Sequence, residues 1–264
     1  MADNPTIVFA PGAWCEPDIY DAVRDILKEK GYPTFAVAHP SINSPTPGVT
    51  TLADDSASLA STLESLADEG KQILLAVHSY GGCVGSCAVE GLDIESHRKQ
   101  GKKGGVIMLM YIAAFVLPKG RSLKDGLGGN FQEWMVFDDK VCRPSPSTDD
   151  RLYFDCPAHY LTRADGSSTK LSASTTSRLV FSGPVTYEPW RDIPTAYFVC
   201  DGDNALPVEV QRVMVEVLKE GALVQPLLTE VKSSHFPMWS VPEILAEALV
   251  EAAGKGMAEA GIKK

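Results

Sequence analysis

The sequence predicts an α/β protein built on a mostly parallel sheet of about six strands flanked by helices. Short apolar runs alternate along the chain with longer segments whose apolar residues recur at helical spacing. Such alternation is typical of β-α-β units, which place parallel strands between two layers of helices. The chain has 264 residues and is 44% hydrophobic, which is enough for one large domain with a sizeable buried core.

The first half of the chain supplies four of the predicted strands. They are expected at residues 6–10, 34–38, 73–77 and 106–113. A helix should follow the first strand, because Ile19, Val23 and Leu27 recur at intervals of four residues. A second amphipathic helix is expected between residues 50 and 68, whose leucines share one face.

The last third of the chain repeats this alternation. Strands are expected at residues 196–200 and 226–231, and helices at 208–219 and 241–253. From Gly254 onward the sequence is rich in alanine, glycine and lysine, so we expect the chain to fray there.

The middle of the chain breaks the pattern. Residues 119–189 mix aromatic residues with proline, serine and aspartate and are too long for an ordinary loop between two strands. Because disordered segments are poor in aromatic residues, this segment is predicted to be a cap over the sheet. We therefore expect a core formed by residues 1–118 and 190–264, with residues 119–189 inserted as a cap, or lid.

Charge and hydropathy exclude several classes of partner. The net charge of −10 and the pI near 5 argue against nucleic acid, because its phosphates would be repelled. No apolar run reaches the ~18 residues needed to span a bilayer, and the polar N-terminus does not resemble a secretory signal. We expect a cytoplasmic monomer or homodimer that acts on a small molecule.

The clearest functional pattern is residues 74–85, where an apolar run ends at Ser79 and a segment of small residues follows. This pattern predicts a strand, a sharp turn and a helix, with the Ser79 hydroxyl exposed at the turn. Gly81 and Gly82 suit a helix that passes close to the strand. The match to the G-x-S-x-G motif is incomplete, because Val77 occupies its first glycine position.

A serine nucleophile needs a nearby imidazole to remove its proton. Of the five histidines, His235 follows the last predicted strand and should lie at the carboxyl edge of the sheet, as Ser79 does. His78 adjoins Ser79 in sequence but is expected to pack under the turn. Of the remaining histidines, His39 is assigned to the end of the second strand, His97 to a basic loop and His159 to the middle segment.

The base in turn needs a carboxylate that orients it. Asp201 and Asp203 both follow the predicted strand 196–200. Asp203 is preferred because it lies further into the loop, after a glycine that lets the backbone turn, and Asp201 is the alternative. Either acid could instead cap the next helix or form a turn.

Acyl transfer also needs amide donors for the developing oxyanion. One is expected to be the N–H of Tyr80, directly after the nucleophile. The other is assigned to Ala13, in the Pro-Gly-Ala-Trp turn of residues 11–14 after the first strand.

With these motifs the chain resembles the α/β-hydrolase superfamily, and most closely its small esterase and hydroxynitrile-lyase-like branch. The matching segments are residues 11–14, 78–82, 193–195 leading to Asp203, and 234–237. Pro11 and Val77 depart from the usual pattern, in which a histidine and a glycine occupy these positions. The resemblance implies an α/β-hydrolase fold with an inserted cap and a Ser79–His235–Asp203 triad.

The predicted activity is that of a serine hydrolase, a carboxylesterase or lactonase that forms an acyl-enzyme. Its substrate is expected to be an apolar, aromatic or polyketide-like small molecule bound by Trp14, Trp134 and Phe137. No metal and no organic cofactor is required. Three alternatives stay open: a lyase that uses the same residues for proton transfer, a cofactor-free cyclase, and a receptor that binds a small molecule without turnover.

Overall fold

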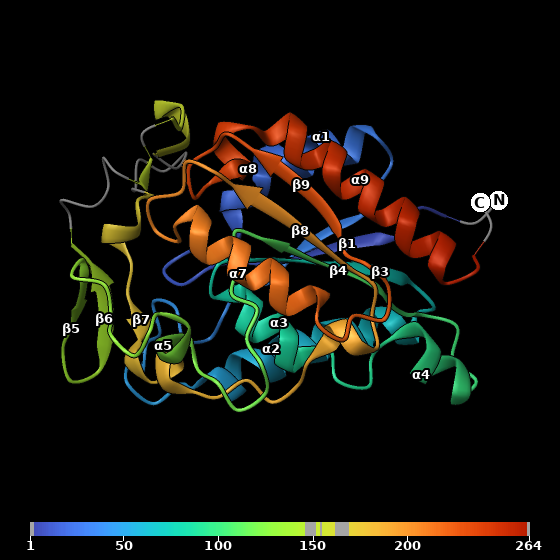
Figure 1. Ribbon diagram of the computed structural model, residues 1–264, viewed down its shortest axis with the longest axis horizontal. Coiled ribbons are helices and arrows are strands. Elements are labelled where there is room, and N and C mark those ends of the chain that lie inside the picture. The colour runs from blue at the N-terminus through green and yellow to red at the C-terminus, as the bar shows by residue number, and fades with distance from the viewer. Residues whose placement is uncertain (1–2, 146–151, 154, 162–168, 263–264) are drawn as a thin grey trace.

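The computed structural model describes residues 3–145, 152–153, 155–161 and 169–262. Its main sheet has six strands in the order β2-β1-β3-β4-β8-β9, and every neighbouring pair is parallel (Figure 1). The strands are β1 (Thr6–Ala10), β2 (Thr34–Ala36), β3 (Gln72–His78), β4 (Gly105–Ile112), β8 (Thr195–Cys200) and β9 (Leu227–Val231). The expected fold class is confirmed, although β2 is two residues shorter than the sequence predicts.

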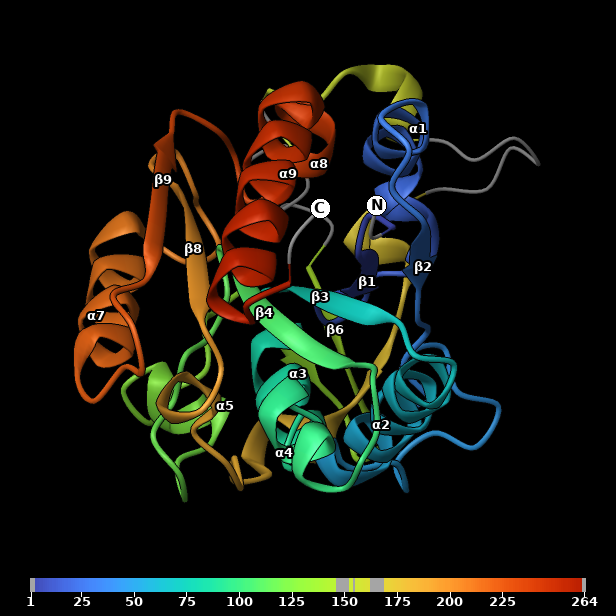
Figure 2. The same cartoon turned by 90° about the vertical axis from the view of Figure 1, so that its right-hand side faces the viewer.

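Helices cover both faces of this sheet. The helices α1 and α9 lie on one face, and α2 and α3 lie on the other (Figures 1 and 2). The helices that flank the sheet are α1 (Asp21–Glu29), α2 (Leu52–Asp68), α3 (Gly81–Ala88), α4 (Ile94–Lys99), α7 (Val208–Lys219), α8 (Pro237–Ser240) and α9 (Pro242–Glu259). A short 3-10 helix, η1 (Pro17–Tyr20), precedes α1.

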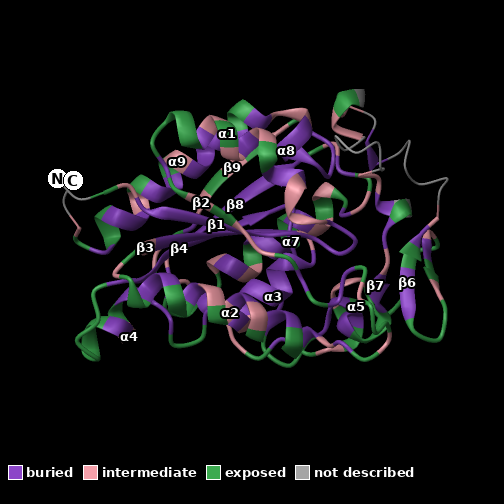
Figure 3. Ribbon diagram, turned by 180° about the vertical axis from the view of Figure 1, so that it is seen from behind, coloured by how far each residue is buried: buried purple, intermediate pink, exposed green. Residues whose placement is uncertain are grey.

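The hydrophobic core lies along the middle strands of the sheet. Every residue of β1 and β4 is buried, as are the last six residues of β3 (Figure 3). Continuous apolar runs are typical of parallel strands that are covered on both faces. The edge strands β2 and β9 are partly exposed along their length.

Most of the described residues between 119 and 189, which we call the cap segment, lie beyond the carboxyl ends of these strands (Figure 1). They form a second sheet with antiparallel order β5-β6-β7. The described elements of the cap segment are α5 (Leu123–Gly126), β5 (Met135–Phe137), β6 (Val141–Pro144), β7 (Thr176–Ser177) and the 3-10 helices η3 (Ala158–Leu161), η4 (Leu171–Ala173) and η5 (Arg178–Ser182). A further 3-10 helix, η6 (Pro189–Arg191), begins at its last residue. The boundaries of the cap as a separate unit stay a prediction.

The C-terminal helix is longer than the sequence predicts. The helix α9 continues past Gly254 to Glu259, and Ala253 and Met257 are buried. Gly256 lies against β4, where an added Cβ would be 3.0 Å from the Ile107 carbonyl oxygen. The expectation that the chain frays from Gly254 is therefore wrong, because tertiary packing stabilises a segment of low intrinsic helix propensity.

The basic loop to which His97 was assigned is helical in the structure. His97 belongs to α4 rather than to a solvated loop, and its buried ring contacts the Gly104 carbonyl through Nδ1 at 2.9 Å.

In the described part of the chain, no helix is both long enough and apolar enough to span a bilayer.

Candidate active site

Ser79 lies at the turn between β3 and α3, with a φ of 53°. A positive φ is strained for a residue with a side chain, so neighbouring contacts must hold the turn. The Ser79 N–H donates to the Ile112 carbonyl at 3.3 Å, and the Ser79 carbonyl accepts from the N–H groups of Gly82 (3.0 Å) and Phe115 (3.1 Å). The expected strand-turn-helix geometry is present, and the hydroxyl lies at the carboxyl edge of the sheet.

Gly82 allows α3 to approach the loop after β4. A Cβ built at Gly82 would be 2.2 Å from the Phe115 carbonyl oxygen. We expect Gly82→Ala to lower the free energy of unfolding by about 3 kcal/mol or more, because the backbone would have to move. In contrast, Gly254→Ala in α9 meets nothing within 4 Å and should add about 0.5–1 kcal/mol. Urea unfolding of both variants tests this difference, and equal stabilities would contradict it.

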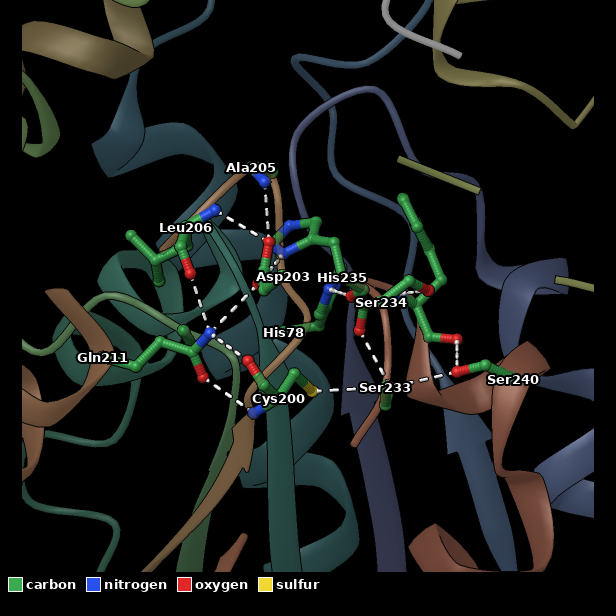
Figure 4. Close-up of polar contacts among 12 residues, drawn as sticks. His78, Cys200, Asp203, Ala205, Leu206, Gln211, Ser233, Ser234, His235 and Ser240 are labelled. Carbon is green, nitrogen blue, oxygen red and sulfur yellow. Dashed lines mark hydrogen bonds and ion pairs between the residues drawn. The ribbon is translucent and has the colours of Figure 1, made fainter. Parts of the chain in front are cut away.

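Asp203 and His235 form a buried pair in the loops after β8 and β9 (Figure 4). The His235 Nδ1–H donates to Asp203 Oδ2 at 2.6 Å. Asp203 Oδ1 accepts from the N–H groups of Ala205 (2.7 Å) and Leu206 (2.8 Å). Asp201, the alternative acid, is exposed. The geometry therefore brings Asp203, and not Asp201, to the imidazole.

Gln211 fixes the Asp203 loop, although it belongs to none of the motifs recognised in the sequence. This fully buried side chain of α7 donates from Nε2 to the Cys200 carbonyl (3.0 Å), the Leu206 carbonyl (2.7 Å) and Asp203 Oδ2 (3.2 Å). Its Oε1 accepts from the Cys200 N–H at 3.0 Å. Both ends of the loop are thus tied to one amide, which orients the carboxylate toward His235.

His78 binds the backbone of the loop that carries His235. Its Nε2–H donates to the His235 carbonyl at 2.8 Å, and the two ring centroids are 4.6 Å apart. Burial, and to a lesser extent the nearby His235, hold the pKa of His78 well below its usual value. A neutral His78 adds no positive charge beside the imidazole of His235, and its packing role agrees with the sequence analysis.

Ser79 and His235 line the same cavity, but they are not hydrogen-bonded to each other. Within the described residues, no hydrogen bond joins Ser79 Oγ to the His235 ring, although Nδ1 of that ring is fixed on Asp203. Catalytic hydrogen bonds are often long without substrate and shorten when it binds. The arrangement can support proton transfer from Ser79 after a small side-chain rotation.

The backbone N–H groups of Ala13 and Tyr80 have no protein acceptor among the described residues. Both residues line the cavity. The next amide, that of Trp14, instead donates to Thr176 Oγ1 at 2.8 Å. The two amides assigned from the sequence are therefore free to bind an oxyanion.

The empty space above Ser79 is about 510 Å³ when the open solvent at the mouth of the cavity is included. Its wall is largely apolar and comes from both the core and the cap segment. The apolar lining side chains include Trp14, Phe115, Leu123, Leu127, Trp134, Met135, Leu171, Phe181, Leu206 and Phe236. Trp14 and Trp134, both assigned to substrate binding, pack edge to face at 5.6 Å.

Phe137 does not line this cavity. Its ring packs edge to face against Phe181 at 5.8 Å and tilted against Phe131 at 4.3 Å, so it lies behind the wall. Phe181 takes the wall position and stacks on Trp14 at 5.5 Å. The sequence shows an aromatic-rich segment but not the fold of that segment, which decides which ring faces the cavity.

Comparison with known proteins agrees with the overall fold. The chain is similar to the probable hydrolase R7 of Phoma sp. (strain ATCC 20986 / MF5453), with 27% identity over 261 residues that cover 95% of this chain and 99% of the relative. It is 28% identical to the alpha/beta hydrolase nvfD of Aspergillus novofumigatus (strain IBT 16806) over 258 residues, covering 96% and 98%. The fold matches a pyrethroid hydrolase from Sphingobium faniae JZ-2 with a TM-score of 0.71 and 22% identity, covering 95% of this chain and 97% of that one.

The family described as the alpha/beta hydrolase family matches residues 7–248, which is most of the chain. The matched region includes Ser79, Asp203 and His235, and its strands have the parallel order described above. The protein therefore belongs to the α/β hydrolase family.

Proposed function

We propose that this α/β hydrolase is a serine hydrolase that cleaves a carboxylic ester or lactone through an acyl-enzyme. The observation that carries the proposal is one cavity that holds Ser79, His235 oriented by Asp203, and two free amides. A nucleophile, a base with its orienting acid, and oxyanion donors are the parts that acyl transfer requires. No metal or organic cofactor is needed for this chemistry.

In the proposed reaction His235 Nε2 removes the proton of Ser79 Oγ while the oxygen attacks the ester carbonyl. The N–H groups of Ala13 and Tyr80 stabilise the resulting oxyanion. The bond to the leaving oxygen then breaks, and His235 gives its proton to the departing alcohol. Water, deprotonated by His235, attacks the acyl-enzyme, the bond to Ser79 Oγ breaks, and His235 gives the proton to Ser79 as the acid is released. Asp203 stabilises the imidazolium in both halves of the reaction.

The cavity wall supports an uncharged, apolar substrate. Among its described lining residues there is no lysine or arginine, and the polar side chains outside the triad and His78 are Cys15, Tyr80 and Gln132. A carboxylate or phosphate on the substrate would lose its hydration there without gaining a cation. We therefore propose a neutral aromatic or polyketide-like ester or lactone.

A panel of p-nitrophenyl esters, from acetate to laurate, tests this function together with a set of neutral lactones. Each ester is paired with an analogue that carries a terminal carboxylate. We expect hydrolysis of the neutral members and at least about a tenfold lower kcat/KM for the charged ones, because the cavity offers no counter-ion. If no ester or lactone in the panel is cleaved, the serine-hydrolase proposal is wrong.

A further inference from the structure

We propose that a buried hydrogen-bond network anchors both oxyanion-hole amides, with Asp55 and Thr176 as its positioning residues. The network joins strand β7 of the cap segment to helix α2 and to the turn that carries Ser79. Neither Asp55 nor Thr176 lines the cavity, so each acts through other residues. The inference rests on the proposed function, because it assigns the amides of Ala13 and Tyr80 to an oxyanion.

The first part of the network holds Tyr80. Its backbone N–H is the proposed donor next to Ser79, and its side-chain hydroxyl donates to Asp55 Oδ2 at 2.7 Å. Burial, together with the Asp55 carboxylate, raises the pKa of Tyr80 well above its usual value, so the hydroxyl keeps the proton that it donates. A residue whose hydroxyl is held in this way has less freedom to rotate its backbone amide.

Asp55 is an unusual residue for its position on α2. Its side chain is fully buried, on the same stripe of the helix as Leu52 and Leu59. Oδ1 accepts from the Ser41 N–H at 2.9 Å, and Oδ2 accepts from the Ser41 hydroxyl at 2.6 Å. In the described part of the chain no lysine or arginine pairs with it. A leucine would be less costly to bury at this position, so the buried carboxylate calls for a role beyond packing.

The second part of the network starts in the cap segment and reaches the loop that carries Ala13. The fully buried Thr176 accepts the Trp14 N–H on Oγ1 at 2.8 Å, and Trp14 Nε1–H donates to the Cys142 carbonyl at 2.8 Å. Trp14 has a strained φ of 64° and directly follows Ala13. These two bonds to β6 and β7 therefore fix the peptide next to the proposed oxyanion donor.

Two further contacts join these parts. The Ser177 N–H donates to the Ser41 carbonyl at 2.9 Å, so the cap strand is tied to the residue that also binds Asp55. His39 packs its ring edge-on to Tyr80 and donates from Nε2 to the Pro11 carbonyl at 2.9 Å. Burial lowers the pKa of His39 and outweighs the opposing effect of Asp55. Neutral His39 thus links Tyr80 to the loop that carries Ala13.

This arrangement predicts an effect on turnover rather than on substrate binding. The oxyanion exists only after Ser79 has attacked, so amides that are slightly misplaced weaken the transition state and leave ground-state binding unchanged. A displacement of about 1 Å can cost on the order of 100-fold in rate. The docking of β7 on the core would thereby determine how well the site is preorganised.

Two conservative variants test the network: Tyr80→Phe removes the hydroxyl, and Thr176→Val removes the acceptor for Trp14. For the best p-nitrophenyl ester we expect kcat to fall by about 10- to 100-fold in each, with KM within about twofold. Affinity for a trifluoromethyl ketone, whose serine adduct carries the oxyanion, should fall in parallel. Thr176→Ser keeps the acceptor oxygen and should restore kcat to within about threefold.

Matched controls remove buried hydroxyls outside the network. Tyr111→Phe loses the contact of Tyr111 with Ser86 Oγ (2.9 Å), and Thr195→Val loses a buried hydroxyl that has no partner. The inference is wrong if Tyr80→Phe and Thr176→Val, folded by circular dichroism, lose no more kcat than these controls. It is also wrong if their losses appear only in KM.

The same assays separate this inference from the proposed function. Activity retained in Ser79→Ala would overturn the acyl-transfer proposal itself. Activity lost in Ser79→Ala but kept in the network variants would overturn only the positioning role. If Tyr80→Phe does not fold, the comparison of Thr176→Val with Thr176→Ser carries the test, because the two variants differ in the acceptor oxygen.

Discussion

Ser79→Ala is expected to lower kcat/KM for the best ester substrate by at least about 10⁴-fold. The substitution removes the only protein atom that forms a covalent bond with the acyl group in the proposed reaction. It should leave the fold intact, because within the described residues Ser79 Oγ makes no hydrogen bond. We expect the free energy of unfolding to change by no more than about 0.5 kcal/mol.

The measurement combines initial rates on the p-nitrophenyl panel with urea unfolding of the same preparations. A low rate with unchanged stability would separate loss of the nucleophile from loss of structure. Activity within tenfold of the wild-type protein would contradict a serine nucleophile. It would favour the use of the cavity for binding or for proton transfer by other groups.

Asp203→Asn is expected to lower kcat by about 10⁴-fold with little loss of structure. Asp203 Oδ1 accepts two backbone N–H groups, so the asparagine oxygen should occupy that position. The amide NH₂ would then face His235 Nδ1, which must become an acceptor. The proton would move to Nε2, and this tautomer cannot accept the proton of Ser79.

Asp201→Asn provides a matched control in the same loop, because Asp201 is exposed and is not bonded to the imidazole. We expect its kcat to stay within about twofold of the wild-type value, in line with a surface substitution. Equal losses in the two variants would show that the loop, rather than the Asp203 carboxylate, controls the rate.

Much of the core was predictable because its signals are local or periodic. Buried parallel strands are continuous apolar runs, and such runs identify β1, β3 and β4 within one or two residues. The positions of Ser79, Asp203 and His235 follow from the rule that loops after parallel strands meet at one edge of the sheet. The close contact at Gly82, which leaves no room for a side chain, likewise agrees with the prediction that α3 passes close to the neighbouring backbone.

The buried polar side chains that hold the site loops could not be predicted in the same way. Gln211 and Asp55 each occupy a buried position on an amphipathic helix, and each bonds to residues of a loop outside that helix. A polar residue on an apolar stripe is a usable signal, since Gln211 shares its helix face with Met214 and Leu218. The sequence does not say which loop such a residue binds, because that depends on the packed tertiary structure.

The cap segment shows the limit of periodicity most clearly. β7 has two residues, and β5 has three, so neither is long enough to produce a recognisable alternation. Their pairing with β6 decides that Phe181 lines the cavity and that Phe137 lies behind it. The end of α9 was missed for a related reason, because packing of Gly256 on β4 outweighs its weak helix propensity.

In the proposed reaction Ser79 becomes acylated during every turnover. The most direct measurement is rapid-quench mass spectrometry of the protein with a slowly hydrolysed neutral ester, followed by peptide mapping. We predict a mass increase equal to the acyl group on the peptide that contains Ser79, and no such adduct in Ser79→Ala. Turnover of the ester with no acyl adduct at any quench time, or an adduct at another residue, would contradict it.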